Sequence, residues 1–235
     1  MIIDCHCHYG KGDGLTGPWD TRANLTKYLI QADEAGIHKT NLFSVFHSDY
    51  ALANFEVAKV VRANPGRFTG FAFINPLRDS GRVLAMIEKA VNNYHFCGVK
   101  VHRHDGRITR EICEAARAFS LPVLYDVMGE ISTVELLTEE YPDVNFIIPH
   151  LGSFADDWKA QAGFCRILSR NRNIYTDTSG VRRFDLLEKA LEDSGPEKIL
   201  YGSDGPWLHP GVELSKIFGL KMHQSDIEKV VGGNF

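Results

Sequence analysis

Residues 1–8 read Met-Ile-Ile-Asp-Cys-His-Cys-His, an apolar run that ends in two histidines two positions apart. The run is typical of a buried strand. Because side chains alternate along a strand, we expect Asp4, His6 and His8 on one face and the two cysteines on the other. Two imidazoles on one strand face can hold one metal ion, and a solvated polar segment is the alternative interpretation.

Seven further strand-like runs follow, separated by stretches with helical spacing. The eight predicted strands span residues 2–8, 40–46, 68–74, 97–102, 121–126, 144–149, 173–178 and 198–203. Their ends recur about every 28 residues, the size of a βα unit. Eight such units predict one (β/α)8 TIM barrel over residues 1–235. An open doubly wound sheet is the alternative, although no strand is followed by a glycine-rich nucleotide fingerprint.

The composition is ordinary for a globular protein, with 44% hydrophobic and 24% charged residues and a formal net charge of −4. This balance argues against nucleic acid or a membrane as the partner, because both require a concentrated basic face. The sequence shows neither a signal-peptide pattern nor a membrane-spanning apolar run, so we expect a cytoplasmic protein. The odd count of five cysteines predicts reduced thiols.

Polar side chains gather at the ends of the predicted strands, where (β/α)8 barrels place their active sites. The set comprises His8, His47, Asn75, His102, His104, Asp126, His150, Asp177 and Asp204, with His209 just beyond. Burying an ionised Asp204 at the end of an apolar strand costs free energy unless a cation contacts the carboxylate. Imidazoles and carboxylates suit Zn²⁺, Mn²⁺ or Fe²⁺, and such an ion lowers the pKa of a water to about 7. The pattern therefore predicts a hydrolytic metal centre.

Four motifs occur in order across nearly the whole chain. They are IIDCHCH at residues 2–8, NFIIPHLG at 145–152, ILYGSDGP at 199–206 and GNF at 233–235. Together they resemble the amidohydrolase superfamily, in particular its amidohydrolase 2 branch of small metal-dependent hydrolases and decarboxylases. The resemblance implies a distorted (β/α)8 barrel with one divalent metal ion, Zn²⁺ being favoured over Mn²⁺ and Fe²⁺. It implies that His6 and His8 are metal ligands.

The resemblance also implies that Asp204 is both a ligand and the general base, and that His150 touches the water or the substrate. One position departs from the family pattern, because the histidine usual at the end of the fifth strand is replaced by Asp126 in PVLYDV. A carboxylate can replace an imidazole, so we take Asp126 as a further candidate ligand, which would favour Mn²⁺ or Fe²⁺. Alternatively Asp126 orients a ligand histidine, or no metal binds.

The fourth predicted strand places Lys100 and His102 on one face. A lysine in an apolar strand needs a partner. We expect a salt bridge from Lys100 to Asp4 or another inward carboxylate rather than the carboxylation seen in binuclear relatives. His102 is a candidate catalytic residue that contacts the substrate or the surroundings of the metal.

These patterns predict a metal-dependent hydrolase of a small-molecule amide, ester or lactone, with Asp204 as general base. Non-oxidative decarboxylation of a small aromatic or unsaturated acid would use the same site. A barrel that has lost catalysis and only binds a ligand is the third alternative. A homodimer is compatible with a barrel of this kind, although the residue pattern indicates no interface.

Overall fold

The computed structural model describes residues 1–15 and 22–235, and in them all eight predicted strands are present. The strands are β1 (Ile3–Lys11), β2 (Arg22–Ala23), β3 (Lys39–Ser44), β4 (Phe68–Phe73), β5 (Gly98–His102), β6 (Val123–Asp126), β7 (Phe146–Ile148), β8 (Ile174–Asp177) and β9 (Ile199–Leu200). Neighbours from β1 and β3 through to β9 are parallel, as βα units require. The unpredicted strand β2 pairs antiparallel with the end of β1.

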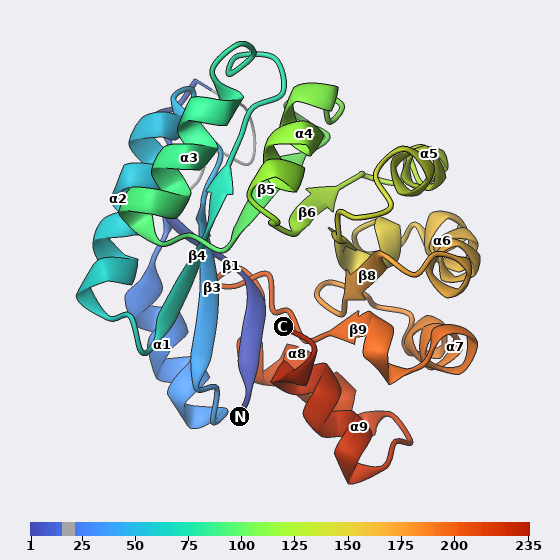
Figure 1. Cartoon of the computed structure of the whole chain (residues 1–235). Helices are drawn as coiled ribbons and strands as arrows, with labels where there is room; N and C mark the ends of the chain where they lie inside the picture. The colour runs from blue at the N-terminus through green and yellow to red at the C-terminus, as the bar shows by residue number, and fades with distance from the viewer. Residues whose placement is uncertain (16–21) are drawn as a thin grey trace.

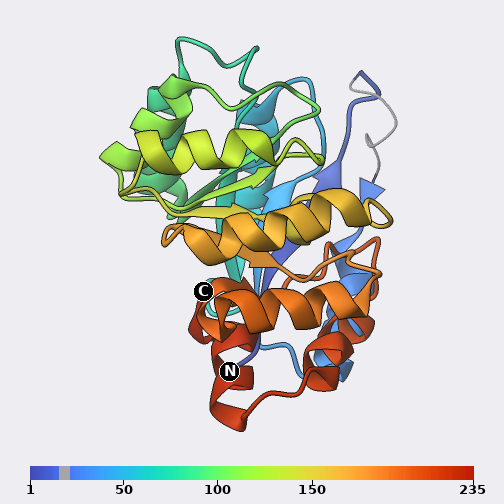
Figure 2. The same cartoon turned by 90° about the vertical axis from the view of Figure 1, so that its right-hand side faces the viewer.

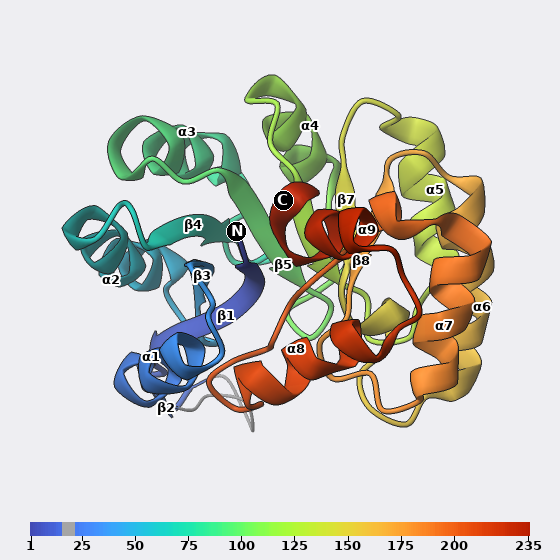
Figure 3. The ribbon, with the colours of Figure 1, turned by 90° about the horizontal axis from the view of Figure 1, so that it is seen from below.

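Helices alternate with the parallel strands and surround them (Figures 1 and 3). They are α1 (Leu25–Glu34), α2 (Tyr50–Ala63), α3 (Val83–Tyr94), α4 (Arg110–Ala118), α5 (Ser132–Glu140), α6 (Trp158–Arg170), α7 (Phe184–Ser194), α8 (Pro210–Gly219) and α9 (Gln224–Glu228). Figure 2 shows α5, α6 and α7 side by side along one flank. Among the described residues, no helix combines the length and the apolar character needed to cross a membrane. All five cysteines are free thiols.

The two ends of the sheet meet through backbone hydrogen bonds. The Cys5 N–H donates to the Tyr201 carbonyl at 3.0 Å, and the His8 N–H donates to the Gly205 carbonyl at 2.7 Å. The segment that follows β9 therefore lies beside β1 and closes the sheet. This closure confirms the predicted (β/α)8 barrel, and the short strands β7 and β9 make it irregular.

The alternation expected along β1 is interrupted. The pairing of β1 with β3 shifts register between Asp4 and Cys7. Cys5 consequently lies in the apolar cluster at the centre of the barrel, whereas the Asp4 carboxylate accepts a hydrogen bond from Tyr28 of α1. The prediction that Asp4 shares a face with the two histidines, opposite both cysteines, was wrong, because a bulge resets which side chains point inward.

The barrel interior below the strand ends is filled by apolar side chains from most of the strands. This cluster contains Cys5, Phe43, Phe71, Leu124, Ile147 and Leu200, with Tyr175 and Phe235 packed against it. Gly98 of β5 gives the Phe71 ring its space, because a Cβ on Gly98 would lie 2.4 Å from the Cε1 atom of that ring. The packed interior leaves the carboxyl ends of the strands as the place for a site.

We expect Gly98→Ala to lower the free energy of unfolding by about 1–3 kcal/mol, because the new methyl group displaces the Phe71 ring from a close-packed core. Gly66→Ala is the matched control, since a Cβ there meets nothing within 4 Å. We expect its effect to stay within about 0.5 kcal/mol. Chemical denaturation of both variants measures the difference, and equal stabilities would contradict the packing argument.

Candidate metal centre and active site

The start and the end of the barrel bring His6, His8 and Asp204 together. The Nε2 atoms of both histidines lie 3.3 Å from Oδ1 of Asp204. One ligand atom from each residue lies within 4.8 Å of the other two. The two histidines are buried, and the Asp204 side chain keeps 13% exposure. Two nitrogens and one oxygen converging in this way form a donor set suited to a divalent metal ion with one side left open.

Each of the two histidines is held at its other ring nitrogen. Nδ1 of His6 lies 2.7 Å from Oδ2 of Asp177, and Nδ1 of His8 lies 3.0 Å from the Ser44 carbonyl. Carbonyl and carboxylate oxygens only accept, so Nδ1 carries the proton in both rings. Each Nε2 therefore directs a lone pair toward Asp204, which is the orientation that a metal ligand needs.

The protonation states agree with this arrangement. Burial lowers the pKa of His8 to about 4 and also lowers the pKa of His6. Burial alone would raise the pKa of Asp204, but the neighbouring imidazoles of His8, His6 and His150 hold that pKa below its usual value. At neutral pH the site thus offers neutral imidazoles and an ionised carboxylate, the forms that bind a metal ion.

His150 enters the same pocket from the turn Pro149–Gly152 that follows β7. Its Nδ1 donates to the Ser179 carbonyl at 2.7 Å, and its Nε2 lies 3.6 Å from Oδ2 of Asp126. Burial alone would lower the pKa of His150, but the surrounding carboxylates, Asp177 foremost, raise it. His150 is therefore suited to hold a proton that it can share with a molecule in the pocket.

The backbone is strained at two of these positions. His150 has φ 59° and Asp204 has φ 55°, in the left-handed region that few residues other than glycine adopt. Such a conformation costs about 1 kcal/mol or more and persists only where the surroundings enforce it. At Asp204 the backbone N–H donates to the His6 carbonyl at 2.8 Å, which ties this conformation to the first strand.

Asp126 contacts histidines and is not among the three clustered ligands. Its Oδ2 lies 3.2 Å from Nε2 of His102 and 3.6 Å from Nε2 of His150. Nδ1 of His102 accepts the backbone N–H of His104, so the His102 proton is on Nε2 and points to Asp126. Direct metal ligation by Asp126 stays a prediction, and these contacts favour the alternative in which Asp126 orients the histidines.

The site lines a pocket of about 450 Å³ with a polar floor and an apolar rim. The floor comprises His6, His8, Lys100, His102, Asp126, His150, Ser153 and Asp204, and the rim comprises Phe46, Met128, Phe154, Trp207 and Leu208. The Trp207 ring lies 4.5 Å from the His8 ring. Most of this rim could not be predicted from the sequence, because no spacing rule relates loop residues from different βα units.

The salt bridge expected for Lys100 was a wrong prediction. The Asp4 carboxylate accepts hydrogen bonds from the hydroxyl groups of Tyr28 and Ser203 instead. Among the residues that the structure describes, Lys100 forms no ion pair, and its Nζ lies 4.9 Å from the centre of the Phe43 ring.

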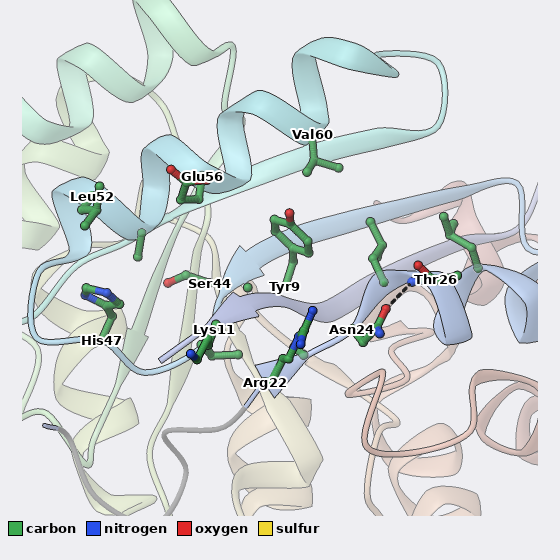
Figure 4. Close-up of a pocket in the computed structure, with 16 residues that line it drawn as sticks. Tyr9, Lys11, Arg22, Asn24, Thr26, Ser44, His47, Leu52, Glu56 and Val60 are labelled. Atoms are coloured by element: carbon green, nitrogen blue, oxygen red, sulfur yellow. Dashed lines mark hydrogen bonds between the residues drawn. The ribbon is translucent and has the colours of Figure 1, made fainter. Parts of the chain in front are cut away.

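Three other histidines near strand ends do not line this pocket, namely His47, His104 and His209. Nδ1 of His209 accepts the Gly211 N–H at 3.2 Å and caps α8. His47 lines a larger cavity of about 680 Å³ between β1, α1 and α2, with Lys11 and Arg22 at its edge (Figure 4). Within the described ranges, that cavity contains no group of metal-ligating side chains. The clustered donors His6, His8 and Asp204 line the smaller pocket instead.

Asp177 at the end of β8 is a candidate positioning residue, because its carboxylate contacts Nδ1 of His6. The sequence assigned it no role, although it lies at a predicted strand end. We expect Asp177→Asn to weaken metal binding by about 10–100-fold, because an amide accepts the His6 Nδ1 proton less strongly than a carboxylate does. Competition with a chelator measures the affinity. Asp193→Asn, which alters a partly exposed partner of Lys189, is the matched control. Equal affinities of the two variants would count against the role of Asp177.

Solved structures with the same fold include several enzymes. A 5-carboxyvanillate decarboxylase from Sphingomonas paucimobilis has a TM-score of 0.75 at 15% identity, covering 99% of this chain and 97% of that chain. A dihydroxybenzoic acid decarboxylase from Polaromonas sp. JS666, solved with bound manganese, has a TM-score of 0.75 at 18% identity. The match covers 99% of this chain and 95% of that chain. A 4-oxalomesaconate hydratase from Rhodopseudomonas palustris has a TM-score of 0.74 at 18% identity. The match covers 100% of this chain and 94% of that chain.

At these identities the likeness concerns the fold. A search of the curated proteins found no match to this sequence. The family model described as amidohydrolase, in contrast, matches residues 3–234. With a match of that length, and with two histidines and an aspartate converging at the carboxyl end of its barrel, the chain belongs to the amidohydrolase family.

Proposed function

We propose that this protein is a metal-dependent hydrolase of a small-molecule amide, ester or lactone, in which His6, His8 and Asp204 hold one divalent ion. The observation that carries the proposal is the convergence of these three groups, each in its metal-binding protonation state. A divalent ion held there would supply a Lewis acid that lowers the pKa of a water to about 7. The mixed nitrogen and oxygen donors suit Zn²⁺, and Mn²⁺ or Fe²⁺ are alternatives.

In this proposal Asp204 is the general base. Its carboxylate is ionised and partly open to the pocket, so it can accept the proton of an attacking water. His150 has a raised pKa and can donate a hydrogen bond to the oxygen on which negative charge develops. His102 lines the same pocket, where it can contact the substrate, and Asp126 holds both imidazoles in place.

A second candidate, non-oxidative decarboxylation of an aromatic or unsaturated acid, is favoured by the shape of the pocket. An apolar rim above a polar floor accommodates a planar ring that carries a polar substituent. Two solved structures with this fold are decarboxylases of carboxyvanillate and of dihydroxybenzoic acid. Both candidates need the same metal site.

Metal analysis combined with a substrate panel tests the proposal. We expect about one equivalent of metal per chain, with activity lost on chelation and restored by Zn²⁺ or Mn²⁺. Acid release from esters, amides or lactones supports hydrolysis, and CO₂ release from aromatic acids supports the second candidate. A metal stoichiometry near zero after incubation with Zn²⁺, Mn²⁺ and Fe²⁺ would overturn both and favour a barrel that only binds a ligand.

A further inference from the structure

Lys100 places a buried ammonium group in the pocket without a partner to receive its protons. The side chain lies on β5 and is 1% exposed, and it lines the pocket together with His6, His8 and Asp204. Within the described part of the chain, Nζ makes neither a hydrogen bond nor an ion pair, and it lies 4.9 Å from the centre of the Phe43 ring. A buried cation with unused N–H donors is unfavourable unless an acceptor reaches it.

The nearby carboxylates do not supply that acceptor. Asp126 contacts His102 and His150, and Asp204 contacts His6 and His8. The Asp177 carboxylate contacts Nδ1 of His6 and accepts a hydrogen bond from the hydroxyl group of Ser179. These charges stabilise the ammonium through space, but none of their oxygens lies within 4 Å of it. The open volume of the pocket is the remaining direction from which an acceptor can approach.

We propose that Lys100 binds the carboxylate of the substrate and thereby selects small anionic molecules. The inference rests on the proposed function and names the substrate class of the same site. A carboxylate offers several lone pairs to an ammonium, and a charge-assisted hydrogen bond is about twice as strong as a neutral one. Burial strengthens the attraction further, because little water screens the two charges.

The rim indicates which kind of molecule would carry this carboxylate. Met128, Phe154 and Trp207 are 43–46% exposed and form an apolar opening above the polar floor. A cavity of about 450 Å³ with such walls fits a small ligand with an apolar or aromatic body. The ligand would place its carboxylate on Lys100 and its body against the rim.

Two probes of equal shape test the charge preference. Benzoate carries the carboxylate, and benzamide is its neutral counterpart. Calorimetric titration of the protein, metal-free and metal-loaded, measures both affinities. We expect benzoate to bind the wild type at least about tenfold more tightly than benzamide, and this preference to disappear in Lys100→Met while benzamide binding is retained. Lys59→Met, which alters an exposed lysine on α2, should keep the full preference.

Lys100→Gln, which removes the charge but keeps a polar side chain, is the second variant, and thermal unfolding of each variant identifies a failure to fold. A tenfold preference that survives the loss of the charge overturns the inference, and so does a wild type that binds benzoate no better than benzamide. The metal-free titration separates this inference from the proposed function, because it tests Lys100 without a metal. Absent metal binding with an intact benzoate preference would overturn only the proposed function.

Discussion

Asp204→Ala is expected to lower kcat/KM by about a thousandfold or more and to release the metal ion. The variant loses one of three converging candidate ligand atoms and, with it, the proposed general base. Two buried imidazoles remain, and they bind a divalent ion far more weakly than the complete set. Metal analysis after gel filtration, together with kinetics on a substrate from the panel, measures both effects.

Asp204→Asn separates the two roles of this residue. The amide oxygen remains available as a ligand, but the group no longer accepts a proton at neutral pH. We expect partial metal retention with activity still lowered by about a hundredfold. Asp156→Asn, at a largely exposed partner of Arg182, is the matched control and should match the wild type. Full activity of Asp204→Asn would contradict the general-base role, and unchanged metal affinity of Asp204→Ala would contradict ligation.

Asp4→Ala is expected to lower the free energy of unfolding by about 3–5 kcal/mol. The fully buried Asp4 carboxylate accepts hydrogen bonds from the Tyr28 hydroxyl, from the backbone N–H of His6 and from both the N–H and the hydroxyl of Ser203. Removing it leaves these donors unpaired in the core. Because Ser203 precedes Asp204, the change also loosens the link that closes the metal site. Denaturant titration measures the loss, and a loss below about 1 kcal/mol would contradict this account.

The pH dependence of stability isolates the charge of Asp4. Burial raises the pKa of Asp4 from 3.8 to about 6, despite the hydrogen bonds. The folded state thus binds the proton more readily than the unfolded state between these values. Protonated Asp4 favours folding below about pH 4, and this contribution is lost as the pH rises through about 6, by up to about 3 kcal/mol.

Asp4→Asn removes this titration. The unfolding free energy of the metal-free wild type, minus that of the variant, should fall between pH 4 and 6 and stay level above pH 7. A difference that does not change with pH would show that Asp4 has similar proton affinities in the folded and unfolded states.

The strands and the candidate metal ligands could be predicted because their signals are local or regularly spaced. Apolar runs about every 28 residues predict βα units, and polar residues at the run ends predict the face on which the site lies. His6, His8 and Asp204 were found in this way, and the structure brings them together. Asp177 also lies at the end of an apolar run, but the spacing of the sequence does not indicate that its partner is His6.

The sequence by itself determined the barrel, its order of βα units and the strand ends that carry the polar side chains. The reason is that hydrophobic periodicity and the positions of polar residues can both be read from local sequence. Only the tertiary structure decided how buried polar groups are paired. The bulge in β1 sends Asp4 to Tyr28 and Ser203, which leaves Lys100 facing the pocket, and a left-handed backbone turns Asp204 toward His6 and His8. The physical reason is that a buried charge takes whichever partners the whole fold brings within reach, and these lie up to 199 residues away in the chain.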